Sequence, residues 1–156
     1  MNHTNFIKQA TELAIKNVQN HNGGPFGAII VKDGEVIAEG VNLVTATNDP
    51  TAHAEIVALR AACKKLASFQ LTGCTLYSSC EPCPMCFGAI YWARPDALYF
   101  SATKENAAAV GFDDSFIYEE LSKSFDYRAI TTKRIPTDLM LKAFDLWKSS
   151  LEKRDY

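Results

Sequence analysis

The residues of this chain that are best suited to chemistry lie in two short stretches, His53-Ala54-Glu55 and Pro82-Cys83-Pro84-Met85-Cys86. A catalytic zinc ion takes three protein ligands and keeps one position open for water. One imidazole and two thiolates supply these three ligands, and the remaining carboxylate can then take up and return protons. The pattern therefore predicts one zinc ion per subunit, held by His53, Cys83 and Cys86, with Glu55 as the catalytic acid and base.

Each half of this pattern also has a simpler interpretation. A lone H-x-E triplet is common by chance, and a lone C-x-x-C can be a thioredoxin-like redox pair. Cys80 could instead act as a fourth ligand and close a purely structural zinc site. None of these interpretations explains Glu55, so the catalytic site is favoured and Cys80 is expected to be a small buried residue.

The two stretches together match the H-x-E and P-C-x-x-C signature of zinc deaminases. With their neighbours they resemble the cytidine deaminase superfamily, in the branch shared by guanine deaminases and tRNA adenosine deaminases. Other stretches are similar to the bacterial guanine deaminases in particular, and the resemblance covers essentially the whole chain, most weakly over residues 122–150. These stretches are Gly23-Gly24-Pro25-Phe26-Gly27-Ala28, Tyr91-Trp92-Ala93-Arg94-Pro95 and Gly111-Phe112-Asp113-Asp114-Ser115-Phe116-Ile117-Tyr118.

The resemblance implies a set of substrate contacts around the metal. Asn42 would hydrogen-bond the base, Asp114 would accept a hydrogen bond from a ring N–H, and Tyr156 would close the pocket. Phe26 would pack against the ring or the zinc-binding histidine, and the backbone near Ala54 would help to hold the tetrahedral intermediate. Without the resemblance, these side chains would be interpreted as ordinary turn, helix-cap, core or disordered residues.

The reaction that the resemblance implies is hydrolysis of guanine to xanthine and ammonia. A tRNA adenosine deaminase shares the catalytic signature and is the nearest alternative, and a cytosine or cytidine deaminase is a weaker one. A zinc-stabilised binding protein without catalysis is an alternative of another class. The presence of Glu55 beside a three-ligand site argues against that last interpretation.

The resemblance implies a small-molecule purine base as the partner, and the charge of the chain disfavours nucleic acid. The formal net charge is -2, so no overall positive field attracts a phosphate backbone. No apolar run approaches the roughly 20 residues that cross a bilayer, and residues 1–5 lack the features of a secretory signal. A cytoplasmic location is therefore expected. The five cysteines are an odd number with three clustered close together, and in a reducing compartment such clustering favours metal binding or redox chemistry.

The elements that must position these residues follow from the apolar pattern. Apolar residues at helical spacing predict a first helix, and Asp33-Gly34 between two apolar runs predicts a β-hairpin. The ligand stretches fall at the first turns of two later helices, where the helix dipole favours thiolates. We expect helices at residues 4–20, from about 51 to 68, 85–92, 115–121 and from 137 onward, with strands at 26–31, 36–38, 74–77, 97–100 and 127–132.

The alternation of strands and helices predicts an α/β fold. Together with the resemblance, it indicates a cytidine-deaminase-like three-layer α/β/α sandwich with a mixed sheet of about five strands. We expect one deaminase domain over residues 1–156. The last helix has apolar side chains that must be buried, and the resemblance implies a homodimer whose subunits exchange the segment from about 120 to 156. These side chains are Leu139, Leu141, Phe144, Leu146, Trp147 and Leu151.

Overall fold

The computed structural model describes residues 2–156, which form two compact units, one extending to Asp114 and one over Ser115–Tyr156. The first unit is built on a four-stranded sheet in the order β2-β1-β3-β4. Strand β1 is antiparallel to both β2 and β3, whereas β3 and β4 are parallel, so the sheet is mixed as predicted. The strands are β1 (Gly27–Lys32), β2 (Glu35–Val41), β3 (Cys74–Cys80) and β4 (Ala97–Ala102).

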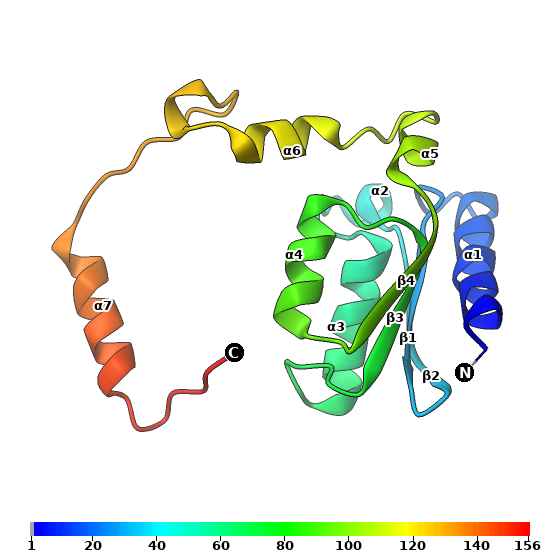
Figure 1. Ribbon diagram of the computed structural model, residues 1–156, viewed down its shortest axis with the longest axis horizontal. Coiled ribbons are helices and arrows are strands. Elements are labelled where there is room, and N and C mark those ends of the chain that lie inside the picture. Colours follow the sequence, from blue (N-terminus) through cyan, green and yellow to red (C-terminus); the bar gives the residue numbers. More distant parts are fainter. Residues whose placement is uncertain (1) are drawn as a thin grey trace. The chain divides into compact units, whose positions relative to one another are not determined.

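Helices cover both faces of this sheet and complete the predicted three-layer sandwich (Figure 1). Helix α1 (His3–Gln19) packs on one face, where Phe6 meets Tyr77 in a small core cluster. Helices α3 (Ala54–Leu66) and α4 (Pro84–Ala93) pack on the other face around a larger cluster. Two short helices, α2 (Val44–Thr47) and α5 (Lys104–Ala108), were not foreseen from the sequence.

The first two strands form the predicted hairpin, which turns at Asp33 and Gly34. Both residues have positive φ angles, 51° and 85°, which is the geometry of the tight turns whose twist matches that of paired strands. The apolar runs on either side of the turn therefore pair with each other, Val31 with Val36 and Ile30 with Ala38.

Two glycines in the hairpin strands allow helices to approach the sheet closely. A Cβ atom at Gly40 would overlap the carbonyl oxygen of Ala54, and one at Gly27 would overlap the carbonyl oxygen of Ala10. Only glycine can occupy such a position without displacing the helix. Because Ala54 is the first residue of α3, Gly40 sets the depth at which that helix begins.

The second unit contains α6 (Ser115–Ser122), a 3-10 turn η1 (Phe125–Tyr127) and α7 (Asp138–Ser149). The prediction of a strand at 127–132 is wrong, because the described chain there ends the 3-10 turn at Tyr127, is irregular after it and pairs with no other strand. The Glu120 carboxylate accepts the N–H of Ala129 at 2.7 Å and so takes a donor that a strand would need. The described chain thus has four strands and not about five.

The two helices of this unit agree with their predicted positions. Helix α7 begins as expected, with the Thr137 side chain accepting the N–H of Leu139 at 3.3 Å as a helix cap. Neither α6 nor α7 has a buried residue. Among the described residues, no helix is both long and apolar enough to span a membrane.

Candidate zinc and substrate site

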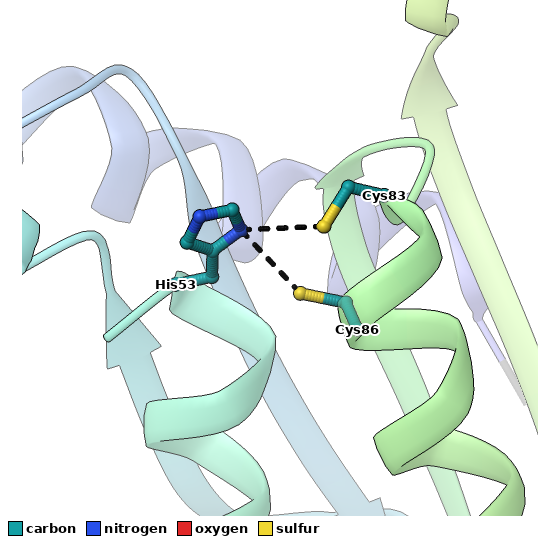
Figure 2. Close-up of side chains that lie close together, drawn as sticks. All are labelled: His53, Cys83 and Cys86. Carbon is teal, nitrogen blue, oxygen red and sulfur yellow. Dashed lines mark hydrogen bonds between the residues drawn. The ribbon is translucent and has the colours of Figure 1, made fainter. Parts of the chain in front are cut away.

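His53, Cys83 and Cys86 come together where α3 and α4 begin (Figure 2). Their ligand atoms all lie within 4.8 Å of one another. His53 Nδ1 is 3.5 Å from Cys83 Sγ and 3.6 Å from Cys86 Sγ. Bonds of about 2.0 Å to nitrogen and 2.3 Å to sulfur, at tetrahedral angles, place the two atoms about 3.5 Å apart. The donor set and its spacing therefore fit a zinc ion.

The local backbone explains why these side chains converge. His53 and Cys83 are the N-cap residues of their helices, both with extended backbone, and neither uses its side chain to cap the helix. Pro84 occupies the first turn of α4, where its missing N–H costs nothing. Cys86 follows within the same turn and reaches the same side as Cys83. Helix N-termini favour negative charge, so both thiolates are stabilised where they are needed.

The two cysteines and the histidine are also coupled electrostatically. The hydrogen bond from Cys86 lowers the pKa of the Cys83 thiol to about 4, and His53 contributes a smaller lowering. The same hydrogen bond raises the pKa of Cys86, which acts as the donor. The pKa of His53 is raised by the hydrogen bond between its own side chain and Cys83. Zinc binds thiolates and neutral imidazole, so loading the site with metal releases protons.

Glu55 lies in the first turn of α3 and is buried, with 6% of its surface exposed. Its Oε1 accepts a hydrogen bond from Ser78 Oγ at 3.3 Å, and its Oε2 lies 3.5 Å from Cys86 Sγ. Burial raises the pKa of this carboxyl group. A raised pKa makes a carboxyl group a better proton acceptor, as a catalytic base must be.

Cys80 does not belong to the ligand cluster. Its Sγ donates to the carbonyl oxygen of Thr103 at 3.6 Å, and burial raises its pKa to about 11, so it stays a thiol. Among the described residues the metal-binding group consists of one histidine and two cysteines. This count leaves a coordination position open, which argues against a closed structural site.

Asn42 is buried and held by several hydrogen bonds. Its N–H donates to the carbonyl oxygen of Phe26 at 3.2 Å, and its Oδ1 accepts the N–H of Val44 at 3.3 Å. The bond from Val44 fixes which end of the amide is Oδ1, and Nδ2 is then its donor end. Asn42 lines a cavity of about 730 Å³ together with Gly23, Gly24 and Phe112. That volume lies within the usual range of ligand pockets, although its lining does not include the zinc-binding side chains.

The other predicted contact residues occupy different surroundings. Phe26 packs edge to face against Phe112, with ring centroids 4.9 Å apart. Ala54 is fully buried at the start of α3. Asp114 ends the first unit, and burial is the main cause that raises its pKa, followed by the negative charge of Cys83. Tyr156 belongs to the second unit and is exposed.

Two polar residues near this site escape prediction from the sequence. Ser78 is buried in β3 and donates to Glu55, and Asn17 is buried in α1 and donates to the carbonyl oxygen of Asn42 at 2.9 Å. The available signal was weak: a serine pair in an otherwise apolar strand and an asparagine on the apolar face of a helix. Their partners are distant in sequence, so no local pattern connects them.

The sequence of this chain is similar to those of known deaminases. Residues 1–102 match the family model described as the cytidine and deoxycytidylate deaminase zinc-binding region. The chain is 53% identical to a guanine deaminase of Bacillus subtilis (strain 168) over 156 residues, which is 100% of both chains. It is 45% identical over 86 residues to a tRNA-specific adenosine deaminase of Aquifex aeolicus (strain VF5), covering 55% of this chain and 57% of that one.

Solved structures give a similar result. The X-ray structure of the guanine deaminase from Bacillus subtilis superposes with a TM-score of 0.97 and covers 100% of this chain and 99% of that chain, at 53% identity. A guanine deaminase from Nitrosomonas europaea superposes with a TM-score of 0.67 at 36% identity, over 70% of this chain and 63% of that one.

Proposed function

The chain belongs to the cytidine and deoxycytidylate deaminase family and, within it, to the guanine deaminases, and we propose that it is a zinc-dependent enzyme that hydrolyses guanine to xanthine and ammonia. One observation carries the choice of substrate. The similarity to a guanine deaminase extends over 100% of the chain, whereas the similarity to the Aquifex tRNA-specific adenosine deaminase covers 55% of it.

The chemistry follows from the ligand cluster and the buried carboxylate beside it. We propose that His53, Cys83 and Cys86 would hold the zinc ion, which when bound would supply water with a pKa lowered toward about 7. Glu55 takes one proton from the attacking water and delivers it to a ring nitrogen. As the tetrahedral intermediate collapses to the carbonyl, Glu55 takes the second proton from its hydroxyl group and passes it to the amine, which leaves as ammonia when the C–N bond breaks. Its burial keeps a proton available for these transfers, and Ser78 Oγ holds one carboxylate oxygen in place during them.

The remaining contacts select the free base. Asn42 Nδ2 donates to an acceptor atom on the purine, and Asp114 accepts from the imidazole N–H, which a nucleoside lacks because its sugar replaces that hydrogen. Phe26 packs against the ring, and the backbone near Ala54 supports the tetrahedral intermediate. Tyr156 closes the pocket over the bound base.

The exposed apolar side chains of the second unit support a homodimer. Leu139 is 76% exposed and Trp147 is 48% exposed, both on a helix with no buried residue. On the first unit, Tyr91 and Trp92 of α4 are exposed as well. Apolar surface of this extent is covered in a stable protein. We propose one deaminase domain per chain whose segment from about residue 120 to 156 packs on the partner subunit, in a cytoplasmic enzyme.

An assay of ammonia release tests this function. Zinc-loaded protein is expected to release ammonia from guanine and not from guanosine, adenine, cytosine or cytidine. Glu55→Gln should retain zinc but lower turnover by roughly 100- to 10,000-fold, since a positioned acid and base contributes that much. Preferential deamination of adenosine in tRNA, with binding that salt abolishes, would instead identify a tRNA deaminase.

A further inference from the structure

Asn17 is a buried polar side chain that touches the proposed substrate-binding residue from outside the zinc cluster. It lies near the end of α1 and is 2% exposed. Its Nδ2 donates to the carbonyl oxygens of Gly24 and Asn42, each at 2.9 Å. Turning the amide around would place its oxygen against two carbonyl oxygens, so this orientation is fixed. Helix α1 is thereby tied to the chain before β1 and to the residue after β2.

Gly24 and Asn42, whose carbonyl oxygens accept these two hydrogen bonds, both line the same cavity. The main chain of Asn42 is held on two sides, by Phe26 at its N–H and by Asn17 at its carbonyl oxygen. On a third side, a Cβ atom at Gly23 would overlap the Asn42 carbonyl oxygen, so the wall is already at contact distance. The direction of the Asn42 side chain therefore depends on these anchors.

An asparagine at this position brings both a cost and a gain. Its Oδ1 is buried and has no hydrogen-bond partner among the described residues. An unpartnered buried acceptor lowers the stability of the fold. An apolar side chain of similar size avoids that loss but leaves the carbonyl oxygens of Gly24 and Asn42 without this donor. What the asparagine supplies, and leucine cannot, is the pair of hydrogen bonds to the pocket wall.

We propose that Asn17 is a positioning residue for substrate binding, which fixes Asn42 and the Gly23-Gly24 wall so that Asn42 Nδ2 meets the base. The inference rests on the proposed function, in which Asn42 contacts the purine. Asn17 donates to neither Glu55 nor the zinc-binding residues. Its loss should therefore raise KM for guanine, with little change in kcat or zinc content.

The test compares two variants of the zinc-loaded enzyme. Asn17→Asp keeps the size of the side chain but turns oxygen toward both carbonyls, and Asn17→Leu removes the two donors and the unpartnered acceptor together. Both variants should raise KM about tenfold, because hydrogen bonds that orient a binding group are lost. Their kcat should stay within about twofold of the parent enzyme. In a Glu55→Gln background, where turnover is strongly reduced, the Kd for guanine by equilibrium dialysis should rise in parallel.

Two further variants separate the possible outcomes. Phe6→Leu weakens the packing of the same helix against Tyr77, so it should lower Tm and leave KM unchanged. Asn42→Ala should raise KM at least as much as the Asn17 variants. If Asn42→Ala raises KM but both Asn17 variants behave like Phe6→Leu, the positioning role of Asn17 is overturned and the proposed function stands. An unchanged KM in Asn42→Ala would instead overturn the substrate contact on which the inference rests.

Discussion

The buried carboxylate of Glu55 is supported by a hydroxyl group from the sheet. Ser78 is 2% exposed, and its Oγ lies 3.3 Å from Glu55 Oε1. One carboxylate oxygen is therefore held by β3, and the other, Oε2, faces Cys86. A proton carrier acts efficiently only when it is within hydrogen-bond reach of both its source and its destination. The orientation of Glu55 is therefore a property of β3 as well as of α3.

Replacing Ser78 with alanine tests this support. Ser78→Ala should lower kcat by about three- to tenfold, because one hydrogen bond to a charged group is lost, and leave KM and zinc content unchanged. The neighbouring Ser79 is a matched control, since its Oγ accepts the N–H of Gly27 and does not contact Glu55. Steady-state kinetics of both variants, with zinc measured on each, checks the expectation. Equal losses in kcat for the two serines would contradict it.

Asp114 gives a prediction for pH dependence. Burial raises the pKa of this carboxyl above its ordinary value of 3.8, with a smaller contribution from Cys83. The ionised carboxylate accepts a hydrogen bond from a ring N–H more strongly than the protonated carboxyl group does. As the pH falls toward the raised pKa, Asp114 becomes protonated, so KM for guanine should increase on acidification.

A comparison with Asp114→Asn assigns this pH dependence to its group. The variant is expected to have a higher KM at neutral pH and to lose the increase on acidification that the parent enzyme shows, because an amide does not titrate. KM measured across the acidic range for both proteins decides the point. If the increase persists in Asp114→Asn, another group is responsible.

Among the elements, α3 and α4 carry the zinc-binding residues at their first turns, and the sheet determines where those turns lie. Gly40 of β2 is in contact with the backbone of α3 at Ala54 and Ala58. A methyl group there must displace either the helix or the strand, because close-packed interiors do not absorb added atoms freely. The position of His53 and Glu55 thus depends on a residue in a different element.

Gly40→Ala is therefore expected to destabilise the fold by about 1–3 kcal/mol, the usual cost of overpacking, and to weaken zinc binding. Gly88 of α4 is a suitable control, since a Cβ atom there meets nothing within 4 Å. Gly88→Ala should be neutral or stabilising by up to about 1 kcal/mol, because alanine favours helix over glycine. Denaturation curves and a zinc competition assay distinguish the two. Normal zinc affinity in Gly40→Ala would show that α3 tolerates displacement.

For the molecule as a whole, the exposed apolar surface of the second unit is the reason to propose that subunits exchange this segment. The exchange can be tested by complementation between two variants of low turnover. Glu55→Gln lacks the proton carrier and Tyr156→Ala lacks the proposed pocket closure, so each protein alone should have low turnover. If Tyr156 completes the partner's site, a heterodimer of the two contains one intact site. Co-expression should then restore about one quarter of normal turnover, since half of randomly paired dimers are heterodimers with one complete site each.

The opposite outcome is equally informative. If each chain closes its own pocket, both sites of the heterodimer remain defective, and mixing gives no more than the average of the two single variants. Size-exclusion chromatography with light scattering on the same samples establishes that dimers are present. A monomeric protein with full activity would exclude the dimer and the exchange together.

Much of the site was predictable because its signals are local. The ligand types, their spacing and their places at helix starts follow from a few adjacent residues, and so does the hairpin turn at Asp33-Gly34. Full-length similarity to a guanine deaminase then confirmed the family, the fold and the zinc chemistry. The roles of the individual substrate contacts remain predictions.

Only the tertiary structure determined the contacts between residues that are distant in sequence, because these contacts have no local signature. Ser78 reaches Glu55 across 23 positions of the sequence, and Asn17 reaches Asn42 across 25. The strand expected at 127–132 does not form, because a β-strand depends on a neighbour for its hydrogen bonds and Glu120 takes one of the available donors. Motifs made of adjacent residues can be recognised from the sequence, whereas hydrogen-bond partners that are distant in sequence are determined only when the chain packs.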